Sequence, residues 1–194
     1  MEHPAPIFIG YFPKHTEPGS LLQAPGVEEI CSVSECISGG PEGWMNAWLH
    51  NETWMFDREE RAVLMVADEL VHYDLYAYRL FPVRFDDREV TPIEVPRTAE
   101  ERLDEYEFLG YDIVEDRVYQ TSPRSDGPGP YECSPLSCNY GYKRFCVNRH
   151  CLLDGLDYAW ETCARIAAEA KEHGSWEPGP YLLMEVHRKR RQAG

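Results

Sequence analysis

The chain of 194 residues is long enough for one domain with a sizeable core, and its hydrophobic fraction of 43% excludes a disordered chain. Its formal net charge of −15 opposes unspecific binding to phosphate backbones, so we expect no nucleic-acid partner. No apolar run approaches the roughly 20 residues that cross a membrane, and the first residues lack the order of a signal peptide, so we expect a cytoplasmic protein without a membrane partner.

Short apolar runs separated by proline and glycine dominate the N-terminal part of the chain. The run 7–12 predicts a buried first strand, and residues 30–33 predict a second strand. Residues 13–26 contain several prolines and glycines, which is typical of a loop. Residues 42–50 are rich in aromatic and apolar side chains, which predicts a short helix.

Two pairs of residues have the spacing of a capping box, the signature of a helix start. Asp57 and Glu60 precede apolar residues at near-helical spacing, which predicts a helix over 58–70. Thr98 and Glu101 form the second pair and predict another helix. In both helices, the side chains of these pairs would accept hydrogen bonds from backbone N–H groups of the first turn.

The middle of the chain contains two patterns that are typical of strands. Residues 75–85 alternate between aliphatic and aromatic side chains, and Pro82 near the end indicates a strand that reaches the edge of a sheet. Residues 109–114 and 118–121 predict a hairpin.

The clearest helix lies near the C-terminus, where an apolar stripe predicts a helix over 153–171. Residues 180–186 predict a closing strand. Because strands and helices alternate irregularly, we expect an α+β fold, with a mixed or mostly antiparallel sheet packed against about three to four helices. We expect residues 1–187 to form this single domain and residues 188–194 to form a basic C-terminal tail.

Seven cysteines, an odd number, argue against a disulfide scaffold. Six of them form three pairs with four residues between the partners: Cys31 and Cys36, Cys133 and Cys138, Cys146 and Cys151. The last two pairs lie close together in the sequence, so their four thiolates could bind zinc, with His150 as an alternative nitrogen ligand. An iron–sulfur cluster could use the same thiolates.

The cysteines also have a purely structural interpretation, which we weigh above the metal site. Free cysteine is among the most buried residue types, and a gap of four residues does not force two sulfurs toward one point. Cys163 belongs to the apolar stripe of the last predicted helix, so we expect it in the core. We therefore predict no cofactor from the sequence, although the cysteine spacing would allow zinc.

Two short stretches that contain cysteines resemble each other: Glu35-Cys36-Ile37-Ser38 and Glu132-Cys133-Ser134-Pro135. The match is too short to indicate an internal repeat, so we interpret it as coincidence.

Catalysis by a cysteine would need a histidine or another base beside the thiol, and nothing in the local sequence selects one such pair. The phosphate-binding loops and the serine-hydrolase motif are absent as well. Because a missing motif is weak evidence, we leave open whether the protein is an enzyme.

Two features favour a binding role. Acidic side chains are concentrated between residues 86 and 117, and they include Glu101, Asp104 and Glu105, which would suit a basic partner. Three tryptophans lie within a dozen residues: Trp44, Trp48 and Trp54. Core packing is their ordinary role, but any that are exposed would be candidates for an interface.

The leading hypothesis is therefore a non-enzymatic acidic binding or accessory protein, such as an inhibitor or immunity-type partner of a basic protein. The alternative is a thiolate-site protein, with structural zinc or a catalytic cysteine, built from Cys133, Cys138, Cys146 and Cys151. The sequence makes no prediction about the oligomeric state.

Overall fold

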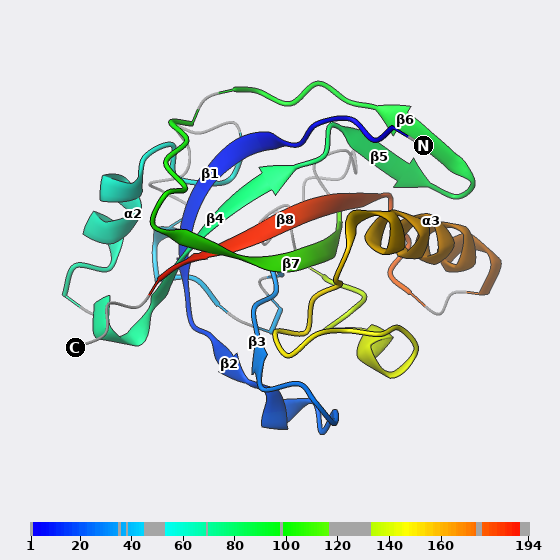
Figure 1. Ribbon diagram of the computed structural model, residues 1–194, viewed down its shortest axis with the longest axis horizontal. Coiled ribbons are helices and arrows are strands. Elements are labelled where there is room, and N and C mark those ends of the chain that lie inside the picture. Colours follow the sequence, from blue (N-terminus) through cyan, green and yellow to red (C-terminus); the bar gives the residue numbers. More distant parts are fainter. Residues whose placement is uncertain are drawn as a thin grey trace.

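The protein is represented by a computed structural model that describes residues 2–34, 36–37, 39–44, 53–68, 70–97, 99–116, 133–173 and 176–190. The main sheet consists of β1 (Ile7–Lys14), β4 (Asp74–Leu80), β5 (Val83–Asp86), β6 (Glu89–Pro92), β7 (Tyr106–Glu115) and β8 (Tyr181–Lys189) (Figure 1). A small second sheet contains β2 (Glu17–Pro18) and β3 (Glu29–Ile30). The helices are α2 (Glu59–Met65) and α3 (Leu156–His173), with 3₁₀ turns at Gly19–Leu21, Leu70–His72 and Gly141–Lys143.

Strand β8 is the centre of the main sheet. It pairs with β7 along its whole length on one side, and with β4 and then β5 on the other side. Strand β1 continues the sheet beyond β4, and β6 continues it beyond β5. Every one of these pairs is antiparallel. The expected α+β class with a mostly antiparallel sheet is confirmed.

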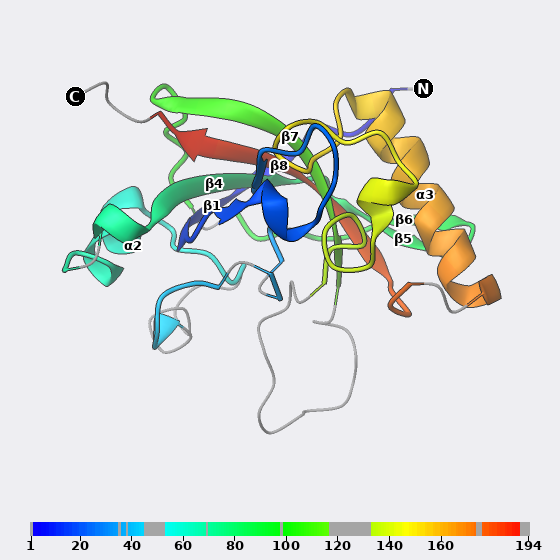
Figure 2. The same ribbon diagram turned by 90° about the horizontal axis from the view of Figure 1, so that it is seen from below.

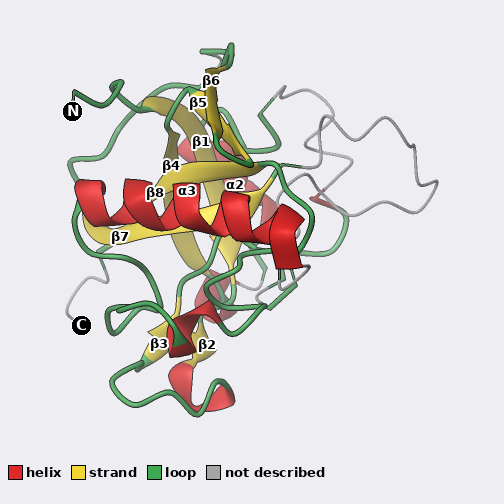
Figure 3. Cartoon of the chain, turned by 90° about the vertical axis from the view of Figure 1, so that its right-hand side faces the viewer, coloured by secondary structure: helices red, strands yellow, loops and turns green. Residues whose placement is uncertain are grey.

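The two faces of the sheet belong to different parts of the core. Leu183 of β8 and Ile113 of β7 pack against α3, which lies across one face (Figure 3). Met184 and Val114, the next residues along these strands, belong to a second cluster that includes β1 and α2. This division follows from the alternation of side chains along a strand, because neighbouring residues point to opposite faces.

Two glycine bulges allow other segments to approach the sheet closely. Gly10 in β1 and Gly110 in β7 have positive φ values of 138° and 144°. A Cβ at Gly10 would lie 2.4 Å from the carbonyl oxygen of Phe56, and a Cβ at Gly110 would lie 2.8 Å from Cβ of Leu152. Glycine is therefore required at both positions on steric and conformational grounds.

The described residues contain two α-helices, fewer than the three to four expected. Helix α3 and strand β8 confirm the predictions for 153–171 and 180–186 with shifted ends, and β1 confirms the first strand. None of the helices in the described part of the chain has both the length and the apolar character needed to cross a membrane.

Helix α2 is shorter than the predicted 58–70, because its expected cap is engaged elsewhere. Its N-cap residue is Arg58, which makes no side-chain capping bond. The carboxylate of Asp57 instead accepts a hydrogen bond from Arg61 at 2.8 Å, and its carbonyl oxygen accepts one from the backbone N–H of Glu100. At the other end, 3₁₀-type bonds from Val66 and Ala67 close the helix.

The prediction of a helix at Thr98 and Glu101 is wrong, since residues 99–103 form no helix. The phenol of Tyr11 donates a hydrogen bond to the carbonyl oxygen of Glu100 at 3.0 Å and accepts one from the backbone N–H of Arg102 at 2.9 Å. These tertiary bonds use the backbone groups that a helix would need for its own first turn. Thr98 itself lies outside the described residues.

Pro82 divides the strand predicted over 75–85 into β4 and β5. Proline has no backbone N–H to donate, and Val83 bonds back to the carbonyl oxygen of Phe81 at 2.7 Å, which interrupts the ladder. After the break, β5 forms a tight hairpin with β6 across Asp87 and Arg88, which the sequence patterns did not reveal.

Three further predictions have mixed outcomes. Strand β3 (Glu29–Ile30) overlaps the second strand expected over 30–33 at Ile30 alone. The first half of the predicted hairpin lies in β7, which pairs with β8, whereas residues 118–121 lie outside the described part. Most of the short helix expected over 42–50 also lies outside it.

Arg188 and Lys189, assigned to a basic tail from the sequence, belong to strand β8. Arg188 is buried, and its guanidinium binds the carboxylates of Glu29 and Glu107. The pairing of β8 with β4 and β7 thus extends the sheet two residues into the expected tail.

Candidate metal-binding site

Three cysteine sulfurs from distant parts of the sequence meet beside the sheet. The Sγ atoms of Cys36, Cys133 and Cys138 all lie within 4.8 Å of one another, and those of Cys36 and Cys133 are 3.3 Å apart. Cys36 follows β3 in the chain, and the other two belong to the segment that precedes α3. Figure 2 shows these two segments on the same side of the sheet.

A buried carboxylate holds the two segments together. Asp112 lies in β7 and is completely buried. One carboxylate oxygen accepts hydrogen bonds from the hydroxyl of Ser32 at 2.9 Å and the backbone N–H of Val33 at 2.7 Å. The other oxygen accepts a hydrogen bond from the hydroxyl of Ser134 at 2.7 Å. Asp112 therefore links the segment that leads to Cys36 with the segment that carries Cys133 and Cys138.

A buried lysine fixes the first segment from the other side. The ammonium group of Lys14, in β1, donates hydrogen bonds to the carbonyl oxygens of Ser32, Val33 and Ser34 at 3.0, 2.8 and 2.7 Å. Only 1% of Lys14 is exposed. A buried ammonium group must be satisfied by acceptors, so this contact fixes the backbone two residues before Cys36.

The second segment is attached to the end of β7 and folds as a tight turn. The backbone N–H of Glu115 donates to the carbonyl oxygen of Cys133 at 2.9 Å. The backbone N–H of Cys138 returns to the carbonyl oxygen of Ser134 at 2.8 Å, which brings the two sulfurs of this turn together. A four-residue gap alone does not impose this proximity, but the turn does.

The three sulfurs have unequal tendencies to ionise. The thiol of Cys133 donates to the sulfur of Cys138 and, helped by Ser34, lowers the pKa of Cys138 to about 5. The same hydrogen bond, with burial, raises the pKa of Cys133. Burial also raises the pKa of Cys36. The geometry thus stabilises one thiolate at neutral pH, flanked by two thiols that a cation could deprotonate on binding.

No protein-family model matches the chain, and neither a curated protein nor a solved structure is significantly similar to it. The chemistry of this site must therefore be judged from its own residues.

The structure divides the cysteine quartet that the sequence suggested. Cys133 and Cys138 lie together, with Cys36 as their neighbour. Cys146 is exposed, and its backbone N–H donates a hydrogen bond to the hydroxyl oxygen of Tyr158 at 2.8 Å. Cys151 is buried in a separate small cluster with Leu22 and Ile30. Cys163 belongs to α3 and is buried in the core, as expected.

His150, the alternative ligand, belongs to a second group with Glu29 and Cys31. Its Nδ1 lies 2.6 Å from the carboxylate of Glu29, which also binds Arg188 through both oxygens at 2.8 Å. The hydrogen bond from His150, followed by those from Arg188, lowers the pKa of Glu29 to about 2. A guanidinium in direct contact with the carboxylate opposes cation binding here.

Cys31, the thiol in that second group, is not activated. It is 2% exposed, and burial raises its pKa to about 12. A neutral thiol is a poor nucleophile, so the neighbouring His150 does not form a nucleophilic pair with it. We interpret this group as an internal ion-pair network that joins β3, β8 and the segment before α3.

The residues proposed for a binding surface are largely engaged within the chain. Glu101 pairs with Arg79, and Glu105 lies 3.1 Å from the ammonium group of Lys189. Asp104 is exposed. Trp44 and Trp54 pack against the core cluster of β1, whereas Trp48 lies outside the described residues.

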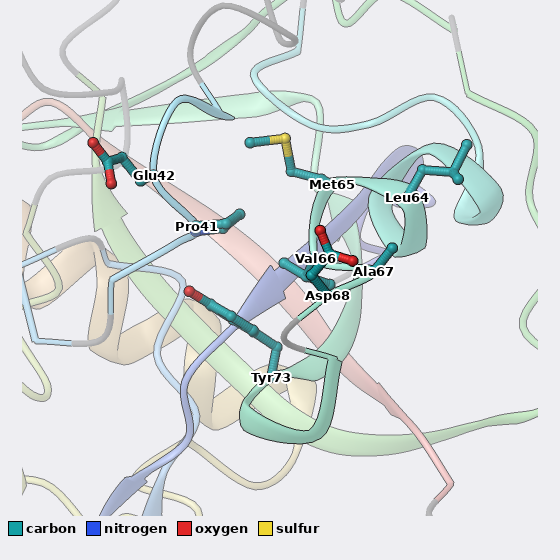
Figure 4. Close-up of a pocket in the computed structure, with 8 residues that line it drawn as sticks. All are labelled: Pro41, Glu42, Leu64, Met65, Val66, Ala67, Asp68 and Tyr73. Carbon is teal, nitrogen blue, oxygen red and sulfur yellow. The ribbon is translucent and has the colours of Figure 1, made fainter.

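A shallow pocket of about 190 Å³ lies between α2 and the segment around Pro41. Figure 4 shows Tyr73 and Met65 pointing toward Pro41, while Leu64 points away from it. Its carboxylates, Glu42 and Asp68, stand apart in this view. The described residues that line it include no cysteine or histidine, so they offer no site comparable to the three sulfurs.

The sequence analysis did not assign three residues to the candidate site: Cys36, Asp112 and Lys14. A signal for Cys36 existed, because the two similar stretches that we interpreted as coincidence carry Cys36 and Cys133, whose sulfurs are in contact. A signal for Asp112 existed as well, since a carboxylate inside an apolar strand must find buried donors. Lys14 follows Pro13 and carried no comparable signal.

Proposed function

We propose that this protein binds one thiophilic metal ion, with zinc as the first candidate, through Cys36, Cys133 and Cys138. The observation that carries the proposal is the approach of three sulfurs to within 4.8 Å of one another. Zinc–sulfur bonds of about 2.3 Å in a tetrahedron place sulfurs about 3.8 Å apart. The observed distances are compatible with this separation, since Cys36 and Cys133 are 3.3 Å apart and all three sulfurs lie within 4.8 Å of one another.

The electrostatic setting supports a cation at this point. Bound metal requires thiolates, and the lowered pKa of Cys138 supplies one of them at neutral pH. Binding would displace the remaining protons from Cys36 and Cys133. Three protein ligands leave a fourth position for a water molecule or another ligand, an arrangement found in zinc sites that are accessible to solvent.

The supporting contacts resemble those that orient metal ligands in general. Asp112 and Lys14 hold the backbone on either side of the sulfurs through buried hydrogen bonds. Residues in such supporting positions commonly affect metal affinity about 10- to 100-fold. The cost of burying an ammonium and a carboxylate is easier to explain if they position a functional group.

The hypothesis of an acidic partner for a basic protein stays a prediction with less support. Its candidate carboxylates Glu101 and Glu105 already bind Arg79 and Lys189 of the same chain. Surface charges that are paired internally attract a basic partner less strongly.

The proposal is tested by loading the purified, reduced protein with zinc, removing excess metal by gel filtration and measuring zinc by plasma mass spectrometry. We expect about one zinc per chain, retained by Cys146→Ser and lost from Cys36→Ser and Cys138→Ser. Cobalt substitution should add thiolate-to-cobalt charge-transfer absorption in the wild type and in Cys146→Ser only.

Cys36 and Cys146 are both exposed, so their serine variants form a matched pair that should not disturb the core. Circular dichroism verifies that each variant is folded. Zinc that is absent from the loaded wild type, or that persists in a folded Cys36→Ser/Cys138→Ser double variant, contradicts the proposal.

A further inference from the structure

The contact between Cys36 and Cys133 in the sulfur group has a geometry from which a disulfide can form. The Sγ atoms of Cys36 and Cys133 are 3.3 Å apart, and a disulfide bond is about 2.05 Å long. The sulfurs would therefore need to approach by little more than about 1 Å. The backbone on both sides is held by Asp112, through Val33 and Ser134, so the two cysteines face each other in the folded protein.

We propose that peroxides oxidise Cys36 and Cys133 to a disulfide, and that this oxidation removes two of the three sulfur ligands from the site. The second half of this inference rests on the proposed metal function. The first half does not, because the sulfur contact is independent of any metal. A disulfide sulfur carries no negative charge and binds metals weakly, so the oxidised and metal-bound forms exclude each other.

The reaction balances with hydrogen peroxide as the oxidant. The sulfur of Cys36, as the thiolate that forms when its thiol proton leaves, attacks one peroxide oxygen and the O–O bond breaks. The departing hydroxide takes up that proton to form water, and a sulfenic acid is left on Cys36. The sulfur of Cys133 then attacks the sulfur of Cys36, the S–O bond breaks, and the hydroxyl leaves with the Cys133 proton as a second water. Each sulfur loses one electron, and peroxide accepts both.

Exposure and proximity select this pair from the seven cysteines. Cys36 is exposed whereas Cys138 is only partly exposed, so a small oxidant from solvent reaches Cys36 first. Cys31, Cys151 and Cys163 are buried in three different hydrophobic clusters. Cys146 is exposed, but in the part of the chain that the structure describes no other sulfur contacts it.

The position of Cys36 just beyond the anchored residues favours the bond as well. Lys14 binds the carbonyl oxygen of Ser34, and Cys36 lies two residues beyond Ser34 in a turn. Its backbone N–H donates to the hydroxyl of Ser34 at 3.1 Å, which keeps the thiol directed toward Cys133. A short approach at Cys36 then leaves the buried anchors unchanged.

The test treats metal-free protein with an equimolar amount of hydrogen peroxide, blocks free thiols with N-ethylmaleimide, and maps cross-linked peptides by mass spectrometry. We expect one disulfide, between Cys36 and Cys133, so that two of the seven thiols no longer react in the denatured protein. Cys146→Ser and Cys138→Ser should still form it, and Cys36→Ser should not. The inference is overturned by sulfenic or sulfinic acid on Cys36 without a cross-link, or by a cross-link between Cys133 and Cys138.

A second measurement separates this inference from the proposed function. Zinc-loaded protein is treated with peroxide while a chromogenic chelator records free zinc, and a thiol reductant is then added after peroxide has been removed. We expect release of the bound zinc in parallel with the disulfide, and rebinding after reduction. If the protein binds zinc but peroxide forms no disulfide, only this inference is overturned. If the disulfide forms but the protein never binds zinc, only the metal function is overturned.

Discussion

The carboxylate of Asp112 accepts a hydrogen bond from the hydroxyl of Ser134 at 2.7 Å, and both groups are completely buried. Its second oxygen accepts bonds from Ser32 and Val33. One side chain of β7 thereby joins the two segments that bring Cys36 to Cys133 and Cys138. Burial raises the pKa of Asp112, although these hydrogen bonds oppose the shift.

Replacing this carboxylate should loosen both the fold and the sulfur group. In Asp112→Asn the amide has only one oxygen, so its NH₂ group faces donors and leaves at least one of them unsatisfied. We expect a loss of about 2–4 kcal/mol in the free energy of unfolding, measured by urea denaturation. Zinc affinity should fall about 10- to 100-fold in the variant that remains folded at low temperature.

Asp104→Asn is a suitable control, because Asp104 is exposed in the turn before β7. Its free energy of unfolding should stay within about 0.5 kcal/mol of the wild type. Equal effects of the two substitutions would show that Asp112 does not organise the site.

The Glu29 carboxylate should make stability depend on pH in the acidic range. His150 and Arg188 lower its pKa from 4.5 to about 2 in the folded protein. A depressed pKa means that the ionised group stabilises the fold at pH values above 4.5, and that this contribution is lost as the pH falls from 4.5 toward 2. The stability difference between wild type and Glu29→Gln should therefore be largest at neutral pH and shrink in acid.

We expect this difference to be about 1–3 kcal/mol at pH 7, after allowance for the partial exposure of Glu29 to solvent. It is measured by urea denaturation at several pH values between neutrality and the acid transition. Glu28→Gln serves as the neighbouring control, because Glu28 and its partner Arg149 are both largely exposed. A difference between wild type and Glu29→Gln that is constant across this pH range would contradict the assignment.

Gly110 should tolerate no side chain. Its φ of 144° disfavours other residues, and a Cβ would lie 2.8 Å from Cβ of Leu152 and 2.9 Å from the carbonyl oxygen of Leu153. We expect Gly110→Ala to lower the free energy of unfolding by about 2–4 kcal/mol through backbone strain and steric overlap. The measurement is thermal or urea denaturation followed by circular dichroism.

Gly39→Ala provides the comparison, because a Cβ there would meet no atom within 4 Å. We expect a change of less than about 0.5 kcal/mol. If Gly110→Ala were as stable as Gly39→Ala, the bulge would not be the feature that docks residues 152 and 153 against β7.

Elements that depend on local pattern were predictable from the sequence. The apolar stripe of α3 and the apolar runs of β1 and β8 indicate burial on one or both faces, because the type and spacing of residues along the chain determine which faces avoid water. Errors arose where a tertiary contact outweighed a local preference. Tyr11 binds the backbone around Glu100 and Arg102, and that contact replaced the helix indicated by a capping box.

The candidate site was likewise predictable only in part. Spacing in the sequence marked Cys133 and Cys138 as partners, because a turn of a few residues can bring them together. It favoured Cys146 and Cys151 as the remaining ligands, since they are the nearest cysteines in the chain. The structure instead supplies Cys36, which is 97 residues from Cys133.

The sequence by itself determined the acidic composition, the α+β class, the main core elements and half of the cysteine pattern, because these depend on residue type and on periodicities of a few residues. Only the tertiary structure decided which sulfurs meet. That meeting requires Asp112 of β7 and Lys14 of β1 to bind the same segment, and so it depends on strands that pair across most of the chain. No local pattern encodes contacts over such separations, because they arise from the packing of the whole sheet.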